Sequence, residues 1–565
     1  MPQRRVVIVG GVAGGASCAA RLRRMDEHAE IFIFERSGYV SFANCGLPYY
    51  LGGVITQRSK LLVATPERFR DILNIEVRTR QEVRAIDRNA KTIEVANVDT
   101  GRSSTESYDV LVLAPGASPI RPPLPGIDLP GVFTLRNLED TDAIHHWSTH
   151  QEAERAVVVG GGYIGLEMTE NLSRRGLEVT LLEAGDQLML PFDPEMVTPV
   201  NQELRRNGVD LLLSKPAAAF EPGPGGTLTV LTHGSERFSA DLVVLAAGVR
   251  PDVALACAAG IELGTTGGIR VDDQMRTSDP NIFAVGDAVE VRDCVTGSPA
   301  LIPLAGPASR QGRVAADVIA GRDARFRGVQ GTAVVGVFDL TLGMTGANEK
   351  TLRRCGIAYR KSYNHAMHHA GYYPGAQAMA LKMLYAPKDG RLLGAQAVGR
   401  AGVDKRIDVI AMAIQKGGTV FDLEEAELCY APQYGSAKDP VNLAGFVAGN
   451  TLRGDVQTVG WDDWIARTNN GEPMPFVLDV RPAALAAVAS VPGAVNIPLG
   501  ELRARLGELP RDREIWVHCG IGQTSYFATR MLRQHGFENV HNISGGITSF
   551  HMLPDTNRDV HLDRG

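Results

Sequence analysis

The sequence predicts an α/β protein of several domains, in which helices alternate with largely parallel strands. Two observations lead to this fold class. A pattern of apolar strand, glycine-rich turn, helix and second strand starts near residue 5 and is repeated from about residue 155. The chain also has 565 residues, which at roughly 100–200 residues per domain is too many for a single hydrophobic core. We expect two Rossmann-like domains, then an α+β domain and a small C-terminal α/β domain.

The first repeat is "RRVVIVGGVAGGAS", followed by the strand "AEIFIFE". Gly10 and Gly15 fit the first and third glycines of a dinucleotide-binding fingerprint, but the second position holds Val12. Glu35 ends the second strand, 20 residues after Gly15. In this arrangement the glycines let the backbone approach a pyrophosphate, helix N–H groups bind it, and the acid holds a ribose. The alternative is a glycine-rich turn in another kind of α/β domain.

The second repeat, "RAVVVGGGYIGLEMTENL", has all three glycines in register, and its acid ends the next strand. These residues are Gly160, Gly162, Gly165 and Glu183. Two such units in one chain predict two bound dinucleotides. An acid at the strand end favours a free ribose 2′-hydroxyl, so we expect NADH, with NADPH possible if basic residues arrive from other loops.

Two later stretches read as strands that return to this plan. "YDVLVLAPGASP" contains a strand that ends at the Pro115-Gly116 turn, and "NIFAVGDA" contains a strand that ends at Gly286-Asp287. The alternative for each is a buried strand followed by a turn. After about residue 325 the sequence suggests a hairpin sheet with helices, then a polar stretch, then strands and helices again. The expected domains are 1–115 with 250–322, 116–249, 325–450, a linker at 451–470, and 471–565.

Two cysteines stand at positions suited to chemistry. Cys45 lies in "SFANCGLPYY", where the fifth residue after it is Tyr50 and not a second cysteine. Cys519, in "VHCGIGQTS", follows a strand and precedes a helix, so it faces helix N–H groups. That environment stabilises a thiolate or a bound anionic sulfur.

The composition excludes several classes of protein. Apolar residues make up 44% and charged residues 22%, and the net charge is −6, which gives no nucleic-acid footprint. We find no apolar run of the ~20 residues that span a bilayer, and no signal-peptide cleavage site. The seven cysteines are scattered without a CxxC motif, so we expect neither a metal site nor a disulfide framework. A reducing cytoplasm is the expected location.

The glycine motifs, together with "SFANCGLPYY", "APGASP" and "AVGDA", resemble the pyridine nucleotide–disulfide oxidoreductases. Within them the chain resembles the single-cysteine branch, which includes coenzyme A disulfide reductases, NADH oxidases and NADH peroxidases. "GGVAGGAS", including Val12, resembles the coenzyme A disulfide reductases. The C-terminal "LDVRP", "NIP", "HC" and "SGG" resemble a rhodanese domain. Nearly the whole chain thus resembles fused coenzyme A disulfide reductase–rhodanese proteins, also described as NADH-dependent persulfide or polysulfide reductases.

The resemblance implies a role for each matching residue. FAD would be held by Gly10, Gly15, Glu35, Pro115, Gly116 and Asp287, and NADH by Gly160, Gly162, Gly165 and Glu183. Cys45 would be the redox cysteine beside the flavin. Coenzyme A would be bound by Ser17, Arg21, Arg24, Ser41, Asn44 and Lys438. Taken alone, the arginines read equally well as a solvated helix face.

The resemblance also implies a homodimer whose third domain completes the partner's active site. "HAGYYPGA" and "CYAPQYGSAKDPVN" match the segments that reach across. Tyr372 and Tyr430 would lie near the cysteine as acid or hydrogen-bond donor, although Tyr373 could take the place of Tyr372. Without the resemblance these tyrosines read as core or surface aromatics.

One position departs from the rhodanese pattern. Thiosulfate-using rhodaneses often carry an arginine five residues after the cysteine, and here that position is Thr524. This weakens the case for thiosulfate but allows a persulfide on Cys519.

The expected activity is reduction of a persulfide, polysulfide or coenzyme A disulfide by NADH, through Cys45 and bound coenzyme A, with sulfane sulfur handled by Cys519. One alternative is an NADH peroxidase or oxidase that cycles Cys45 through a sulfenic acid. Another is a sulfur carrier or redox sensor. The expected partners are a small sulfur substrate and a second copy of the chain, with no nucleic acid and no membrane.

Overall fold

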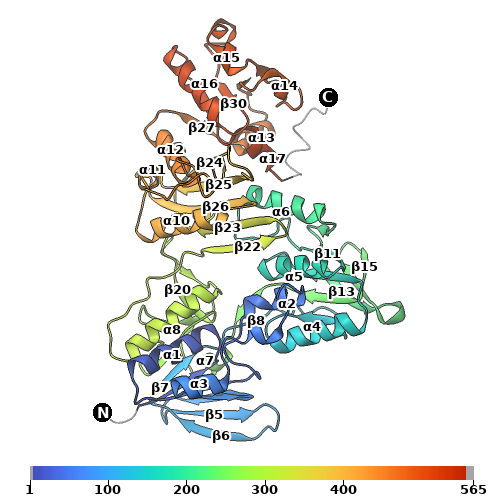
Figure 1. Ribbon diagram of the computed structural model, residues 1–565, viewed down its shortest axis with the longest axis vertical. Coiled ribbons are helices and arrows are strands. Elements are labelled where there is room, and N and C mark those ends of the chain that lie inside the picture. The colour runs from blue at the N-terminus through green and yellow to red at the C-terminus, as the bar shows by residue number, and fades with distance from the viewer. Residues whose placement is uncertain (1–3, 555–565) are drawn as a thin grey trace. The chain divides into compact units, whose positions relative to one another are not determined.

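A computed structural model describes residues 4–554, and these divide into two compact units (Figure 1). The first comprises residues 4–188 with 208–329, and the second comprises residues 189–207 with 330–554. Residues 1–3 and 555–565, which the sequence assigned to the first and last domains, lie outside the described part. No helix of the described part is both long and apolar enough to cross a bilayer.

The first unit is built on a five-stranded sheet in the order β19-β7-β1-β2-β3, and every pairing in it is parallel. The strands are β1 (Arg5–Val9), β2 (Glu30–Glu35), β3 (Glu76–Thr79), β7 (Val110–Leu113) and β19 (Ile282–Ala284). Val6, Val7 and Ile8 are fully buried, as expected for a strand covered on both faces.

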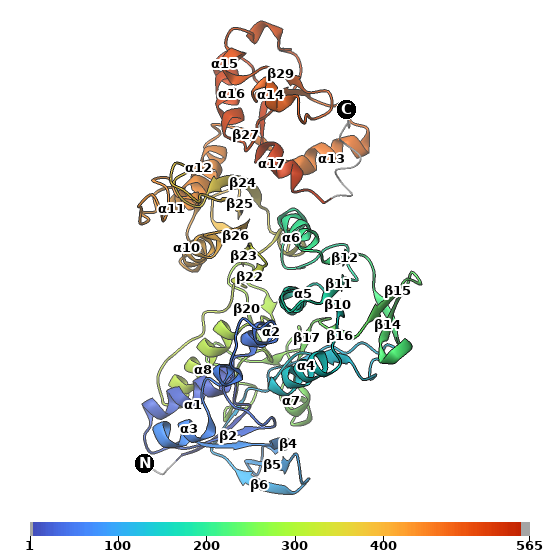
Figure 2. The same cartoon turned by 45° about the vertical axis from the view of Figure 1, so that its right-hand side comes forward.

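Helices α1 (Ala13–Met25) and α8 (Ala305–Ile319) lie side by side in this unit (Figure 2). They approach so closely that a Cβ at Gly312 would stand 2.3 Å from the carbonyl oxygen of Gly14. Small residues on both helices therefore fix how α8 packs along the glycine turn that precedes α1.

The second sheet of this unit has the order β12-β11-β10-β16-β9, again with parallel pairings. Its strands are β9 (Val132–Thr134), β10 (Arg155–Val159), β11 (Glu178–Leu182), β12 (Asp210–Leu212) and β16 (Leu242–Leu245). The central strand and its two neighbours repeat the arrangement of β7, β1 and β2. The chain thus leaves the first sheet, builds the second, and returns to the first with β19.

Smaller elements complete the first unit. The remaining helices are α2 (Leu47–Leu51), α3 (Pro66–Leu73), α4 (Leu138–His150), α5 (Tyr163–Arg174) and α7 (Ala254–Ala258). The remaining strands form the groups β4 (Gln81–Asp87), β5 (Thr92–Asn97) and β6 (Ser103–Ser107); β13 (Ala217–Pro222), β14 (Leu228–Thr232) and β15 (Arg237–Ala240); β8 (Ala117–Pro119) and β17 (Val249–Pro251); and β18 (Ile269–Arg270), β20 (Val289–Arg292) and β21 (Pro299–Ala300).

The second unit begins with a five-stranded antiparallel sheet in the order β22-β23-β26-β25-β24. Its strands are β22 (Ala333–Val337), β23 (Leu340–Gly346), β24 (Arg360–Met367), β25 (Ala378–Tyr385) and β26 (Leu392–Gly399). The accompanying helices are α6 (Pro194–Arg206), α9 (Glu349–Arg354), α10 (Val403–Gln415), α11 (Val420–Glu424) and α12 (Pro440–Leu452). Helix α6 lies between β11 and β12 in sequence, yet it belongs to this unit.

The unit ends in a parallel sheet with the order β27-β31-β30-β28-β29. Its strands are β27 (Gln457–Val459), β28 (Phe476–Asp479), β29 (Val495–Asn496), β30 (Ile515–His518) and β31 (Val540–Ile543). Its helices are α13 (Trp461–Asn470), α14 (Ala483–Ala486), α15 (Leu499–Leu502), α16 (Gln523–Gln534) and α17 (Gly546–His551). The predicted fold class is therefore confirmed.

The stretch 451–470, predicted as a linker, instead supplies the end of α12, strand β27 and helix α13. Its polar and glycine residues suggested a linker, but Trp461 and Trp464 are buried in the core of the C-terminal sheet. The two tryptophans outweigh the polar residues because each buries a large apolar area.

Candidate functional site

The first glycine turn is shaped by the packing of the chain itself. Gly10 has a φ of 94°, and a Cβ there would stand 2.1 Å from the carbonyl oxygen of Ala114. A Cβ at Gly15 would stand 1.9 Å from the carbonyl oxygen of Gly10. Only glycine fits either position. Helix α1 starts directly after Val12, so its first N–H groups lie at the carboxyl end of β1, where a pyrophosphate would bind.

The second turn repeats this geometry and leaves an open position. Cβ atoms at Gly160 and Gly165 would stand 2.3 Å from Ala246 O and 1.9 Å from Gly160 O. Gly162, the residue before α5, has no heavy atom within 4 Å of such a Cβ. Two glycines are thus required by the fold, while the third borders free space at a helix N-terminus. This arrangement fits a dinucleotide whose pyrophosphate approaches the backbone.

The acids at the two strand ends have the same local partners. Glu35 accepts hydrogen bonds from the backbone N–H groups of Gly11 and Ser37, both at 2.9 Å. Glu183 accepts from Gly161 and Gly185, both at 2.7 Å. Each carboxylate therefore holds its glycine turn in place, a role that the fingerprint did not predict. Both carboxylates lie at the carboxyl end of the second strand of their glycine-turn unit.

The other residues expected around FAD meet at the carboxyl edge of the first sheet. Pro115 and Gly116 follow β7, and Asp287 follows β19. Arg136 donates to the carbonyl of Pro115 at 3.1 Å. Burial raises the pKa of Asp287, and Arg136 partly offsets this. The edge thus combines a turn, a carboxyl group and a cation, which fits the polar parts of a flavin dinucleotide.

Cys45 lies in the short 3-10 helix η1 (Asn44–Gly46), which runs into α2. Cys45 is exposed, and it is one of seven free cysteines in the described part. Partial burial of the sulfur raises the pKa of Cys45, and the carboxylates of Glu167 and Asp287 raise it further. In the chain alone, the thiol form is therefore favoured at neutral pH.

Tyr49 stands one helical turn after Cys45 and donates its hydroxyl to Glu167 Oε1 at 3.1 Å. Glu167 comes from α5, which packs against α2. Burial raises the pKa of Glu167 to about 7, although the Tyr49 hydrogen bond partly lowers it. Our interpretation of the sequence missed this carboxyl group. The only available signal was a glutamate in the otherwise apolar start of α5, "YIGLEM".

We expect Glu167→Gln to shift the pH dependence of the Cys45 thiol downward by roughly one unit. Glu167 is mostly ionised above about pH 7, where its charge opposes a thiolate at Cys45. Removing that charge favours the thiolate, so the two proteins should differ most above pH 7. The measurement is the rate of Cys45 alkylation by iodoacetamide against pH in the purified holoenzyme. Glu178→Gln, an exposed residue at the start of β11, is the control, and equal profiles for all three proteins would refute the coupling.

Five of the six residues expected to bind coenzyme A lie in the first unit, in two groups. Ser41 and Asn44 lie in the loop that carries Cys45, and Ser17, Arg21 and Arg24 lie along α1. Arg24 is exposed, but Arg21 is already paired with Asp317 of α8, at 2.7 Å. A phosphate at Arg21 would therefore have to share or replace that carboxylate. Lys438 is exposed, in the second unit.

The two tyrosines of the second unit meet each other. The hydroxyls of Tyr372 and Tyr430 are 3.0 Å apart, and both side chains are largely exposed. Tyr373 instead places its ring edge-on to His369. The structure therefore favours Tyr372 over Tyr373 as the partner of Tyr430. Their hydrogen bond raises the pKa of Tyr372, so that its proton is retained at neutral pH.

Cys519 lies where β30 passes into the loop before α16, as expected. Its Sγ accepts a hydrogen bond from the Gly522 backbone N–H at 3.2 Å and one from the Ser525 hydroxyl at 3.3 Å. Burial opposes ionisation, but bonds from Ser525, Thr524 and backbone N–H groups outweigh it and lower the pKa of Cys519. The site thus stabilises an anionic sulfur without a side-chain cation in the loop.

His518, the residue before Cys519, contributes no positive charge at neutral pH. It is fully buried, with its Nε2 3.8 Å from Asp479 Oδ2. Burial lowers the pKa of His518 to about 4 despite that carboxylate. Asp479 is instead paired with Arg481 at 2.6 Å. The hydrogen-bond donors of the loop are therefore the main stabilising groups at the sulfur.

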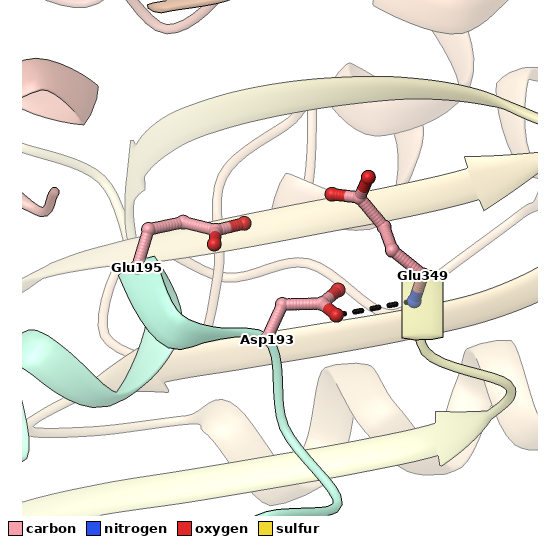
Figure 3. A group of neighbouring side chains, drawn as sticks. All are labelled: Asp193, Glu195 and Glu349. Carbon is pink, nitrogen blue, oxygen red and sulfur yellow. Dashed lines mark hydrogen bonds between the residues drawn. The ribbon is translucent and has the colours of Figure 1, made fainter. Parts of the chain in front are cut away.

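A buried acidic cluster in the second unit was not anticipated. Figure 3 shows Asp193, Glu195 and Glu349 with their carboxylates turned toward a common space. The ammonium group of Lys382 fills that space: it lies 2.7 Å from Asp193 Oδ2 and also contacts Glu195 and Glu349. Because the Lys382 ammonium group already pairs with all three carboxylates, we interpret this group as structural and not as a metal site.

Three segments match known families. Residues 4–312 match "Pyridine nucleotide-disulphide oxidoreductase", residues 332–439 match the dimerisation domain of the same family, and residues 462–553 match "Rhodanese-like domain". The coenzyme A disulfide reductase of Staphylococcus aureus is 38% identical over 445 residues, which are 79% of this chain and 99% of that protein.

Two solved structures cover almost the whole chain. The crystal structure of reduced Bacillus anthracis CoADR-RHD has a TM-score of 0.95 and 46% identity, and the match covers 98% of this chain and 99% of that one. The NAD-dependent persulfide reductase from A. fulgidus has a TM-score of 0.89 and 37% identity, with 97% and 100% covered. The fold implies FAD and NAD(H) as cofactors. The chain is therefore an oxidoreductase that belongs to the pyridine nucleotide–disulphide oxidoreductase family and carries a C-terminal rhodanese-like domain.

Proposed function

We propose that the enzyme uses NADH to reduce persulfides, polysulfides or coenzyme A disulfide. The observation that carries this proposal is the pair of isolated thiols: Cys45 beside the first dinucleotide site, and Cys519 in a loop that stabilises an anionic sulfur. A lone thiol without a neighbouring cysteine needs an external sulfur partner. The names of the relatives, a coenzyme A disulfide reductase and a persulfide reductase, support this substrate class.

The chemistry of Cys45 is thiol–disulfide exchange. Its thiolate attacks one sulfur of a coenzyme A disulfide, forming a mixed disulfide with Cys45 and releasing one coenzyme A thiolate. With a coenzyme A persulfide, attack on the inner sulfur forms the same mixed disulfide and releases sulfide. Breaking the mixed disulfide takes two electrons, which is the chemistry that FAD and NADH supply when bound. Glu183 and the absence of a basic residue in 179–189 favour NADH over NADPH.

Coenzyme A would be bound by the residues around Cys45 and along α1. Ser41 and Asn44 would flank its thiol end, and Ser17, Arg21, Arg24 and Lys438 would face its phosphates. Arg24 is the better phosphate ligand of the two arginines, because it is exposed while Arg21 is paired with Asp317. Whether coenzyme A stays bound between turnovers can be tested by mass spectrometry of the native protein.

The dimerisation-domain match indicates a homodimer. In it, Tyr372 and Tyr430 of one copy would complete the Cys45 site of the other. The Tyr372 hydroxyl, whose pKa is raised by its hydrogen bond with Tyr430 and which therefore keeps its proton at neutral pH, would donate to and protonate the leaving thiolate. The scattered free cysteines agree with a cytoplasmic enzyme.

The main alternative is reduction of peroxide or oxygen through a Cys45 sulfenic acid. That reaction does not require Cys519, whereas the loop around Cys519 directs two hydrogen-bond donors at its sulfur. A sulfur carrier or sensor is a further alternative. NADH consumption should be measured in parallel with coenzyme A persulfide, coenzyme A disulfide, peroxide and oxygen. We expect the sulfur substrates to be turned over fastest; fast peroxide turnover with negligible sulfur turnover would overturn the proposal.

We expect Cys519→Ser to distinguish the role of Cys519 from that of Cys45. NADH-dependent turnover of polysulfide should fall by roughly tenfold or more, because serine cannot accept a sulfane sulfur. Turnover of preformed coenzyme A persulfide should stay within about twofold, because that substrate already carries the sulfur to Cys45. An equal loss on both substrates would count against a sulfur-delivery role for Cys519. Cys355→Ser, in the same unit, is the control.

A further inference from the structure

Strand β24 contacts the C-terminal domain through alternate residues on one face. Lys361 Nζ donates to Asp462 Oδ2 at 2.8 Å, and His365 Nε2 lies 2.8 Å from Ser549 Oγ. Between them, the backbone N–H of Tyr363 donates to Ser544 Oγ at 3.1 Å. Because β24 is the edge strand of its sheet, Ser544 satisfies an N–H group that no neighbouring strand could reach.

The two serines flank the turn that supports the Cys519 loop. Between them lies the Gly545-Gly546 turn, which starts α17. The Ile547 N–H donates to the carbonyl of Cys519 at 2.9 Å, and the Thr548 N–H donates to the carbonyl of Gly520 at 3.0 Å. A Cβ at Gly546 would stand 2.5 Å from the Cys519 carbonyl oxygen, so the two backbones are in direct contact.

The β24 side of this contact is itself firmly held. The Tyr363 hydroxyl donates to Glu195 at 2.8 Å, and Glu195 contacts the buried ammonium group of Lys382. Burial lowers the pKa of His365 to about 4, so its ring is neutral at physiological pH. Ser544 and Ser549 are both buried. A series of contacts therefore connects the buried ionic cluster around Lys382, through β24 and the 544–549 turn, to the backbone of the Cys519 loop.

We propose that Tyr363 and His365 are positioning residues for Cys519: the antiparallel sheet holds the 544–549 turn, and this turn holds the cysteine loop in the shape that directs the Gly522 N–H and the Ser525 hydroxyl at the sulfur. The importance of this for turnover rests on the proposed role of Cys519 as a sulfane-sulfur acceptor. The positioning itself does not, because it concerns only how the thiolate is stabilised.

The test is the pH dependence of Cys519 alkylation in the full-length holoenzyme, with His365→Ala and Ser549→Ala, singly and together. Each change removes the hydrogen bond between His365 and Ser549. We therefore expect each single variant to raise the pH midpoint for Cys519 alkylation by roughly half a unit or more. The double variant should show the same midpoint as the single variants. The pH midpoint for alkylation of Cys45, measured in the same samples, should not change. His365→Gln, which keeps a polar group for Ser549, should restore most of the original midpoint.

Arg360→Ala is the matched control, because Arg360 lies on the same strand but bonds to the Thr451 carbonyl instead. An unchanged Cys519 midpoint in both folded single variants, or a shift as large in Arg360→Ala, would overturn the proposal. If His365→Ala fails to fold, Ser549→Ala alone decides, since it leaves β24 intact. A shifted midpoint together with unchanged polysulfide turnover in Cys519→Ser would retain the positioning role and reject the sulfane-sulfur function.

Discussion

Replacement of Cys45 by serine is expected to lower kcat/KM for NADH-dependent reduction of coenzyme A disulfide by on the order of 10³-fold or more. The thiolate is the only form of the residue that attacks a disulfide, and a serine hydroxyl remains protonated and forms no stable bond to sulfur. Cys45 has no neighbouring thiol to replace it, since the fifth residue after it is Tyr50. The measurement is steady-state NADH consumption with coenzyme A disulfide at several concentrations.

The matched control is Cys257→Ser, an exposed cysteine of α7 in the same unit. It should retain activity within about twofold. Residual activity of Cys45→Ser within tenfold of the original would show that another group attacks the disulfide. That result would also remove the basis for the coenzyme A-binding role of Ser41 and Asn44.

The parts of the site that were predictable are those fixed by local sequence. Gly15 and Gly165 are required by close contact with the carbonyl oxygens of Gly10 and Gly160, five residues earlier. Gly10 and Gly160 face carbonyls of distant segments, but the fingerprint spacing marks all four glycines. Cys519 was found for the same reason: the strand, loop and helix that surround it are consecutive in sequence. Local pattern also predicted the fold class, because strand and helix periodicities are local properties.

The parts that escaped prediction depend on contacts between distant segments. Tyr49 and Glu167 are 118 residues apart, and Lys382 and Glu195 are 187 apart. A single sequence carries no signal for such a pair, because each member reads as an ordinary polar residue on a helix or strand. The same holds for α6. Its sequence lies within the expected second Rossmann-like domain, but the helix belongs to the second unit, which also contains Lys382.

Lys382→Met is expected to destabilise the second unit by about 3–5 kcal/mol. Lys382 is fully buried, and its ammonium group lies among the carboxylates of Asp193, Glu195 and Glu349. Methionine fills a similar volume, so the cost comes from leaving the buried carboxylates of Asp193 and Glu195 without their lysine partner and not from a cavity. The measurement is scanning calorimetry at pH 7, in which the transition of this unit should move to lower temperature by several degrees.

The dependence on pH distinguishes this cause from simple loss of packing. Burial alone would raise the pKa of Glu349, but Lys382 and Lys361 lower it to about 2, and Lys382 likewise lowers the pKa of Glu195. A carboxyl group with a depressed folded pKa stabilises the protein above its unfolded value of about 4.3, and loses that contribution as the pH falls toward 2. Without Lys382 the burial of Glu195 is no longer opposed by that lysine, so its folded pKa rises, and protonation of Glu195 then stabilises the fold.

As the pH falls from 7 to 5, the free energy of unfolding of Lys382→Met should therefore recover part of its loss. Over the same range, the buried carboxyl groups of the original protein should not add to its stability. Lys382→Met combined with Glu195→Gln should also be more stable than Lys382→Met alone, because it removes a buried carboxylate that has lost its lysine partner. Lys416→Met, at the exposed end of α10, is the control and should change stability by no more than about 0.5 kcal/mol. A loss of stability that is the same at pH 7 and pH 5 would mean that Lys382 acts through packing and not through its charge.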